Sequence, residues 1–192
     1  MVKEQPGLDE AKLIRECQRG QAEAGVELVD RYWKRVFAFA YRLTLNRADA
    51  EDIAQETFLR AFSKLSEFNP EGQFKAWLLR IATNLFLDTQ KSPRQKDVSK
   101  GDMTEREKEQ ISVETKAENK EIVAALQDVI GTLSNEQRTV ILLRAVEHME
   151  YHEIAGILGI KEATVRWHMY EGRRILWQKL SKKFDLEALG NE

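Results

Sequence analysis

The chain has 192 residues, enough for one large domain or two small ones, and its 42% hydrophobic and 32% charged content excludes wholesale disorder. Its formal net charge of -2 does not by itself indicate a nucleic-acid-binding protein, so local charge has to decide that question. The absence of a long apolar run and the single cysteine, Cys17, expected as a half-buried helix residue, predict a cytoplasmic protein without an internal disulfide.

Residues 9–91 have the apolar spacing of four helices. These begin near Asp9, Val26, Asp49 and Phe74. Asp9 is placed to cap the first helix, Gly20 to end it, and Asn46 interrupts the pattern before the third. The second has its apolar side chains at three- and four-residue steps, at Val26, Val29, Trp33, Val36, Phe37, Ala40 and Leu43. Residues 68–72 contain Pro and Gly and are expected to form a loop.

Composition changes after the fourth helix. Residues 91–120 carry eight lysines and arginines, seven acidic residues and no aromatic residue. Such a segment buries too little apolar surface to offset the entropy of ordering it. The sequence therefore predicts a domain over 1–91, a flexible linker over 92–118 and a second domain over 119–192.

The second domain contains the pattern of a helix-turn-helix. Ser134 with Gln137 predicts a capping box, and two further helices are expected over 150–158 and 161–183. Gly159 suits the positive φ of a tight turn between them. Ile154, Ala155 and Leu158 are expected to face inward, with Ile160 between the helices and Val165 packing the second helix on the first.

The last helix has seven lysines and arginines against two glutamates over 161–183, a local excess that suits contact with phosphates. Its start carries side chains that fit base edges in the major groove. The candidate duplex-DNA contacts are Lys161, Thr164, Arg166, Trp167, His168, Tyr170, Arg173 and Arg174. The alternative is a three-helix packing module with a solvated basic face.

Three stretches together resemble the extracytoplasmic-function (ECF) sigma factors of bacterial RNA polymerase. They are DAEDIAQETF at 49–58, FKAWLLRIATN at 74–84, and the helix-turn-helix from Tyr151 to Arg166. The resemblance spans nearly the whole chain and rests on the order and spacing of these stretches. It implies an all-α fold, with a four-helix sigma domain 2 and a helix-turn-helix sigma domain 4 joined by the linker.

The first stretch is similar to the segment that contacts the core polymerase in that family. By this resemblance, acidic and amide side chains face the clamp of the β′ subunit. The corresponding residues here are Asp52, Gln55 and Glu56, and Arg60 extends the same helical surface. An ordinary charged helix face is the alternative.

The second stretch resembles the promoter-melting region. The resemblance implies that Phe68 and Asn84 help to hold an extruded base, with Lys75 and Arg80 near the backbone. An extruded base requires a stacking wall, an amide that reads its edge and nearby positive charge. Trp77 falls on the apolar face of its helix and is expected to serve the core.

The resemblance implies a sigma factor that docks on core RNA polymerase, at the β′ clamp and near the β flap, and binds promoter DNA. It also implies an anti-sigma factor that covers these surfaces until a signal arrives. Neither an enzymatic activity, a cofactor, a metal nor a small-molecule substrate is expected. Ala163, Trp167, His168 and Glu171 depart from the family pattern, so the promoter sequence of relatives is not expected to transfer.

Two other functions remain open at the level of sequence. A repressor or activator that acts as a symmetric dimer would occupy a palindromic site without polymerase. A metal-dependent nucleic-acid enzyme would require His148 and His152, four residues apart on an expected helical face, to gather with a carboxylate. Surface histidines explain this pair better, because no HExxH arrangement accompanies them.

Overall fold

The structure is a computed structural model that describes residues 6–91 and 120–184. The chain divides into two compact units, Met1–Lys96 and Asp97–Glu192. Within the described ranges every regular element is a helix, so the predicted all-α fold class is confirmed. The linker predicted for 92–118 lies outside the described residues. No helix in these ranges has the length and apolar character that crossing a membrane requires.

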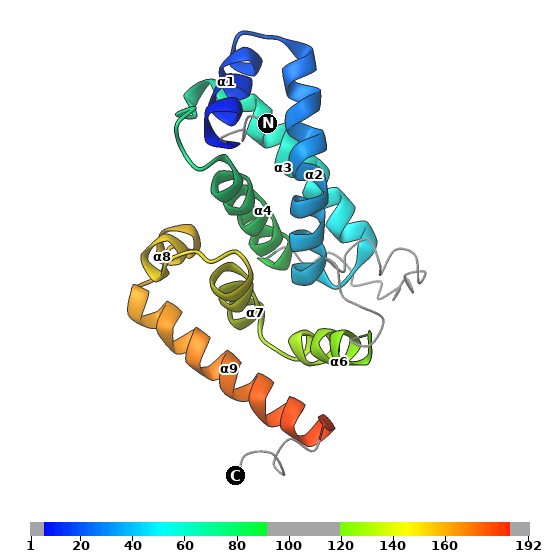
Figure 1. Cartoon of the computed structure of the whole chain (residues 1–192). Helices are drawn as coiled ribbons and strands as arrows, with labels where there is room; N and C mark the ends of the chain where they lie inside the picture. Colours follow the sequence, from blue (N-terminus) through cyan, green and yellow to red (C-terminus); the bar gives the residue numbers. More distant parts are fainter. Residues whose placement is uncertain (1–5, 92–119, 185–192) are drawn as a thin grey trace. The chain divides into compact units, whose positions relative to one another are not determined.

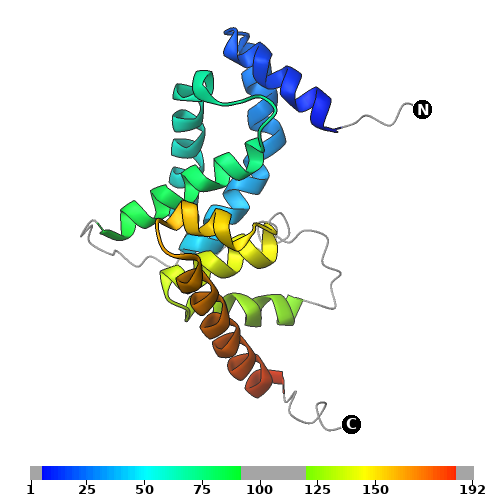
Figure 2. The same ribbon diagram turned by 90° about the vertical axis from the view of Figure 1, so that its left-hand side faces the viewer.

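The N-terminal unit is a helical bundle built around its second helix. Its elements are α1 Pro6–Gln18, α2 Ala22–Thr44, α3 Arg47–Ser63, the short 3-10 helix η1 Leu65–Glu67 and α4 Phe74–Lys91. α2 contacts α1, α3 and α4 (Figures 1 and 2). The fully buried side chains at the centre include Ile14, Leu28, Phe39, Phe74 and Leu78.

The predicted apolar stripe of α2 is correct in its second half and wrong at its start. Val36, Ala40 and Leu43 are buried, whereas Val26 is 61% exposed. Since α2 has neighbours on several sides, its buried surface is wider than one stripe and takes in Leu28 instead. Cys17 is half-buried on α1, as predicted, and this burial raises the pKa of its thiol.

Two predicted helix starts are wrong, and in each case a residue earlier in the chain begins the helix. α3 begins at Arg47, because the Asn46 side chain accepts a hydrogen bond from the backbone N–H of Asp49 and caps the helix. Asp9 lies inside α1, which begins at Pro6, a residue well suited to a first helical turn. Gly20, with a φ of 85°, follows the end of this helix as predicted.

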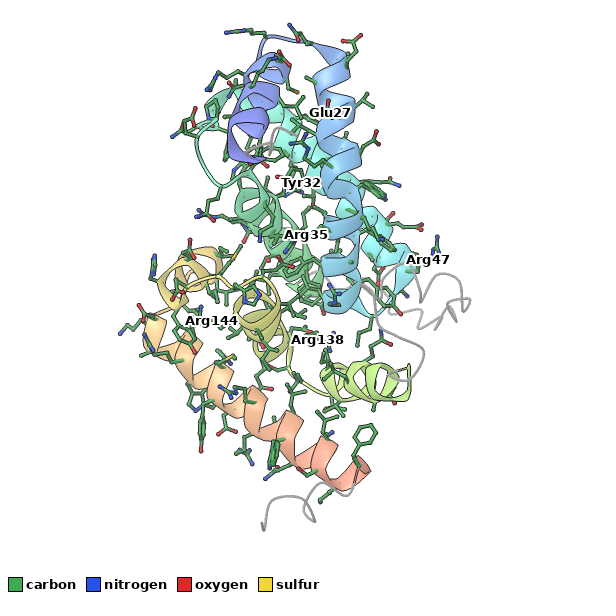
Figure 3. The ribbon with its side chains drawn as sticks, viewed as in Figure 1. Glu27, Tyr32, Arg35, Arg47, Arg138 and Arg144 are labelled. Atoms are coloured by element: carbon green, nitrogen blue, oxygen red, sulfur yellow. The ribbon has the colours of Figure 1, made fainter. Side chains whose placement is uncertain are left out.

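The C-terminal unit contains α6 Lys120–Gly131, α7 Asn135–Ile141, the π-helical segment η3 Leu142–Val146, α8 Tyr151–Leu158 and α9 Glu162–Phe184. The predicted capping box is confirmed, with Ser134 and Gln137 exchanging hydrogen bonds. Arg138 (Figure 3) donates to the carbonyl of Gly131 and is buried, which lowers the pKa of its guanidinium. This contact joins the end of α6 to α7.

The predicted helix-turn-helix consists of α8 and α9. Gly159 has a φ of 65°, the left-handed conformation expected for the turn, and Ile154 and Val165 are fully buried between the helices. Gly172 permits a close crossing farther along α9, because a Cβ there would lie 2.5 Å from Cδ1 of Ile141. The fold thereby leaves the opposite face of α9 exposed.

The two histidines do not share a helical face. His148 has a φ of 59° and lies in the turn before α8, while His152 lies within α8. Both are exposed. Among the described residues, no three histidine, cysteine or acidic side chains gather in a way that would hold a metal ion.

Candidate nucleic-acid interfaces

The outer face of α3 gathers the first set of predicted site residues. Asp52, Gln55 and Arg60 are exposed, and Glu56 is half-buried beside them. The Arg60 Nε donates to Oε1 of Glu56 at 2.7 Å. Ile53 and the other buried residues of α3 lie on the opposite side, because the helix repeats every 3.6 residues. The structure therefore brings all four predicted residues onto one face.

Leu59 lies within this same face and was missed by the sequence reasoning. Its side chain is 66% exposed, although Phe58 beside it is buried. The sequence did contain a sign of this exposure. Leu59 follows Gln55 by four residues and therefore falls on the polar side of the helix. A single exposed apolar side chain is common on protein surfaces, so Leu59 by itself does not mark a binding site.

Phe68 lies in the loop between η1 and α4 and is packed by two aromatic rings. Its ring stacks on Trp77 with 4.6 Å between the centroids and meets Phe74 edge-on at 5.4 Å. Trp77 packs against the buried core, as predicted, while remaining half-buried itself. The Phe68 ring is therefore held in position by packing, and part of it remains accessible.

The remaining residues of this set lie along α4. Arg80 and Asn84 are exposed and four residues apart, so they share a face. Asn84 is two turns beyond Trp77, which puts it about 10 Å along the helix from the residue on which Phe68 stacks. Lys75 is half-buried in the first turn. The structure thus brings Arg80 and Asn84 together and leaves Phe68 at the other end of the same surface.

The outer face of α9 contains most of the third set. The exposed side chains include Arg166, Trp167, Tyr170, Arg173 and Arg174, with Lys161 exposed just before the helix. Trp167 and Tyr170 are 55% and 66% exposed, values too high for core residues. Thr164 is half-buried. Aromatic and cationic side chains therefore alternate along one side of this helix.

His168 departs from this arrangement. It is half-buried, its Nδ1 atom is enclosed and without a hydrogen-bond partner among the described residues, and its ring lies edge-on to Trp167 at 5.0 Å. The helical period turns His168 toward the core side of α9. It lies at the margin of the exposed face.

Arg166 is held by two residues that the sequence reasoning did not select. Its Nε and Nη2 donate to Oε1 of Glu162 at 3.0 and 2.6 Å, and its guanidinium lies 4.4 Å from the centre of the Tyr151 ring. The four-residue spacing of Glu162 and Arg166 was a visible signal for the ion pair. The contact with Tyr151 could not be seen in the sequence because it joins α8 to α9.

A second guanidinium lies over the same ring. Arg144 (Figure 3) is 5.0 Å from the centre of Tyr151 and donates to Glu150 and to the carbonyl of Met149, both at 2.9 Å. The hydrogen bond to Glu150 raises the pKa of Arg144. Two fixed cations therefore flank Tyr151 at the start of the helix-turn-helix.

The second half of α9 contains another ion pair between an arginine and a glutamate of the same helix. Arg174 donates to Oε2 of Glu171 at 2.8 and 3.0 Å, which raises the pKa of its guanidinium. Trp177, one turn farther, is 67% exposed and was also missed by the sequence reasoning. Its signal was its place in the three- and four-residue spacing that continues from Tyr170.

Comparison with known families gives a match in each unit. Residues 28–95 match the family described as Sigma-70 region 2, and residues 124–176 match Sigma-70, region 4. The first match contains the residues of α3 and α4 described above. The second contains α8 and most of α9.

Individual proteins show the same relationship. The chain is 37% identical to the ECF RNA polymerase sigma factor SigE of Mycolicibacterium smegmatis, over 81% of this chain and 61% of that protein. It is 30% identical to the ECF RNA polymerase sigma factor SigW of Bacillus subtilis, over 88% of this chain and 95% of that protein. The chain thus spans less than two thirds of SigE and nearly all of SigW.

Solved structures of similar fold include two protein complexes. CnrH, solved with the cytosolic domain of CnrY, aligns with a TM-score of 0.63 at 24% identity, over 90% of this chain and 97% of CnrH. The sigma factor RpoE of Bartonella quintana, solved with the anti-sigma factor NepR, aligns with a TM-score of 0.63 at 25% identity. That alignment covers 81% of this chain and 95% of RpoE.

Proposed function

The chain belongs to the extracytoplasmic-function sigma factors of bacterial RNA polymerase, and from this membership we propose that it binds core polymerase and directs it to specific promoters. The observation that carries the proposal is the presence of a region 2 match and a region 4 match in one chain. Each match contains an exposed face of different chemistry. A regulator that acts without polymerase would not need the exposed face in the region 2 match.

The face of α3 is the proposed contact with core polymerase, at the clamp of β′. Asp52, Gln55, Glu56 and Arg60 supply charge and hydrogen bonds around Leu59, whose side chain is 66% exposed. An apolar centre within a polar rim is the usual anatomy of a protein interface. Leu59 would bury its apolar side chain at the centre of this contact, so its truncation should weaken binding.

The surface from Phe68 along α4 is the proposed site for melted promoter DNA. Phe68 offers a ring for base stacking, Asn84 an amide for a base edge, and Arg80 positive charge for the backbone. Lys75, nine residues before Asn84, falls on the opposite side of α4 and is the weakest candidate of this set. Because Phe68 and Asn84 lie at opposite ends of this surface, we assign them to different nucleotides of the strand.

The exposed face of α9 is the proposed contact with upstream duplex DNA. Lys161, Thr164, Arg166, Trp167 and Tyr170 lie at or near the start of the helix, the part that enters the major groove in a helix-turn-helix. Arg173 and Arg174 are farther along and suit phosphates. His168 makes the weakest case, because it is half-buried.

The proposed mechanism needs no covalent chemistry, cofactor or small-molecule substrate. One domain, over 1–91, binds the enzyme and the opened strand, while the other, over 119–192, docks near the β flap and binds closed DNA. A linker over 92–118 would let the first contact raise the effective concentration of the second. The protein would work in the cytoplasm, where an anti-sigma factor, as solved with RpoE of Bartonella quintana, would hold it inactive.

Transcription with purified core polymerase on genomic fragments tests this proposal. The chain should support run-off products from discrete start sites and should associate with core polymerase in the absence of DNA. Occupation of a palindromic site by the protein alone, without any association with core, would instead establish a dimeric repressor or activator.

A point variant makes the same test specific to α3. Leu59→Ala should weaken association with core polymerase about tenfold, because burying a leucine side chain contributes about 1.5 kcal/mol or more. Val26→Ala is the matched control, because Val26 is 61% exposed in the same unit but lies on α2. Equal affinities of the two variants for core would remove α3 from the proposed interface.

A further inference from the structure

α1 makes polar contacts with the chain between α3 and α4, in addition to its apolar packing in the bundle. The helix precedes the segment that matches Sigma-70 region 2, which begins at residue 28. Leu13 and Ile14 are buried and anchor α1 in the bundle. Two polar residues of α1, Arg15 and Gln18, reach instead to the chain between α3 and α4, more than 45 residues later in the sequence.

Gln18 binds the backbone of the first residue of η1 and of the residue that follows η1. Its Nε2 donates to the carbonyl oxygens of Leu65 and Phe68, at 2.8 Å each, in a partly buried position. The side-chain NH2 of glutamine has two donor hydrogens, so it can satisfy both carbonyls at once. Gln18 thus ties the backbone of Phe68 to the end of α1.

Arg15 holds the other part of the same loop. Its Nη1 and Nη2 donate to Oε1 of Glu71 at 2.9 and 2.7 Å. Both side chains are largely exposed, at 41% and 65%, so the pair adds little to stability. The pair joins α1 to the loop at a second point.

The loop itself closes tightly between these two contacts. The Asn69 side chain accepts from the backbone N–H of Glu71 at 3.1 Å, and its carbonyl accepts from Gly72 at 2.8 Å. A Cβ at Gly72 would lie 3.0 Å from the Asn69 carbonyl and 3.1 Å from the Phe68 ring. Such a loop has few alternative arrangements once its ends are fixed.

We propose that α1 is a positioning element for melted-strand capture, with Gln18 and Arg15 holding the loop so that the Phe68 ring meets the extruded base without reordering. The inference rests on the proposed role of Phe68 and α4. If the loop is already ordered before the DNA arrives, the entropy cost of ordering it does not weaken binding. Gln18 and Arg15 touch no DNA in this mechanism and act through Phe68.

The test measures how much one base of the melted strand contributes to the affinity of the holoenzyme, the complex of this chain with core polymerase, for promoter DNA. Promoter DNA is made with an abasic site at each position of the melted element in turn, and the affinity of the holoenzyme is compared with that for intact DNA. Loss of one stacked base should weaken binding by wild-type holoenzyme about tenfold at one position. Gln18→Leu, which keeps the volume and removes both donors, should reduce that penalty to about threefold or less.

This readout separates positioning from general stability. A variant that only destabilised the unit would weaken binding to intact and abasic DNA alike and leave their ratio unchanged. If Gln18→Leu holoenzyme loses as much affinity on abasic DNA as wild type does, the proposed role of α1 is wrong, and the proposed role of Phe68 is unaffected. The absence of any abasic penalty in wild type would overturn the melted-strand role of Phe68 together with it.

The exposed pair provides a second variant that does not threaten folding. Arg15→Glu should lower the abasic penalty at least twofold, and the double exchange Arg15→Glu with Glu71→Arg should restore it. Lys12→Glu is the matched control, because Lys12 is exposed on the same helix and pairs with Glu16 of that helix at 3.8 Å. An equal effect of Lys12→Glu and Arg15→Glu would show that charge alone is responsible and would contradict the proposal.

Discussion

In the N-terminal unit, Phe68 is held by stacking on Trp77, by an edge contact with Phe74 and by the hydrogen bonds of Gln18. In the C-terminal unit, Arg166 projects from α9 and is held by one carboxylate of its own helix and one ring of α8. Both belong to faces that we propose to contact DNA. They are restrained by different forces.

The difference matters because packing and exposed ion pairs respond differently to the solvent. Contacts among aromatic rings and partly buried hydrogen bonds are little affected by salt, whereas exposed pairs are screened within about 10 Å at 0.1 M salt. The first arrangement suits the recognition of a base that has to be caught in one geometry. The second suits attraction to phosphates, which is strong at low salt and tolerant of position.

The largest expected effect is the loss of the packing beneath Phe68. Phe74 is fully buried and contacts the rings of Tyr32 (Figure 3), Phe68 and Trp77. Phe74→Ala should lower the free energy of unfolding of the N-terminal unit by about 3–5 kcal/mol, through lost burial and the cavity left behind. Denaturant unfolding followed by circular dichroism measures this change.

The control for this variant lies in the other unit. Trp177→Ala removes a larger side chain, but one that is 67% exposed, and should change stability by less than about 0.5 kcal/mol. A comparable loss in the two variants would mean that the contrast between packed and exposed aromatic residues does not hold.

A smaller effect is expected at the exposed face of α9. Arg166→Ala should weaken promoter binding by holoenzyme by about 1–3 kcal/mol, or about 5- to 150-fold, and leave association with core polymerase unchanged. If Arg166 contacts a phosphate, the slope of log affinity against log salt should fall by about one. Filter binding over a range of salt concentrations measures both quantities.

Two companion variants sharpen this result. Arg31→Ala is a matched control, since Arg31 pairs with Glu27 at 2.8 Å across the same four-residue spacing but lies on α2. Glu162→Gln frees Arg166 from its carboxylate and should raise affinity about two- to fivefold, a change of about 0.5–1 kcal/mol. Equal losses of core binding and promoter binding in Arg166→Ala would place its effect outside DNA contact.

The smallest expected effect is a change with pH in the stability of the N-terminal unit. Glu10 accepts a hydrogen bond from Tyr32, and burial raises the pKa of its carboxyl above the usual 4.5, although Arg31 acts in the opposite direction. The folded chain therefore takes up this proton at a higher pH than the unfolded chain. The resulting stability is fully present below the unfolded pKa and is lost as the pH rises through the folded pKa.

Thermal unfolding of the N-terminal unit over a pH series tests this linkage. Lowering the pH from 7 toward 5 should stabilise wild type relative to Glu10→Gln, whose amide accepts from Tyr32 without titrating. Parallel pH profiles for the two proteins would show that Glu10 has no raised pKa in the fold.

Local patterns in the sequence were sufficient for most of the secondary structure. The helical stripes, the Ser134 capping box and the Gly159 turn depend on residues three or four positions apart, and they are present in the structure. Two of the failures of the local reading were themselves local in origin. Asn46 caps α3 three residues before the predicted start, and the left-handed conformation of His148 removes it from a helix.

The candidate faces were determined by the sequence only in part. It placed Asp52, Gln55, Glu56 and Arg60 on one side of a helix, because helical periodicity alone decides which neighbours share a face. The same periodicity puts Leu59 on that side, but it does not show whether that side is exposed. That outcome depends on which side of α3 the other helices cover.

By itself, then, the sequence determined the helices, the helix-turn-helix and the family, since each is encoded in short, ordered stretches. Only the tertiary structure decided that Phe68 rests on Trp77, that Tyr151 carries two guanidiniums and that Gln18 binds the loop before α4. Most of these contacts join residues far apart in the chain, up to 50 positions for Gln18 and Phe68. No periodicity marks such pairs, because the packing of separate helices brings them together.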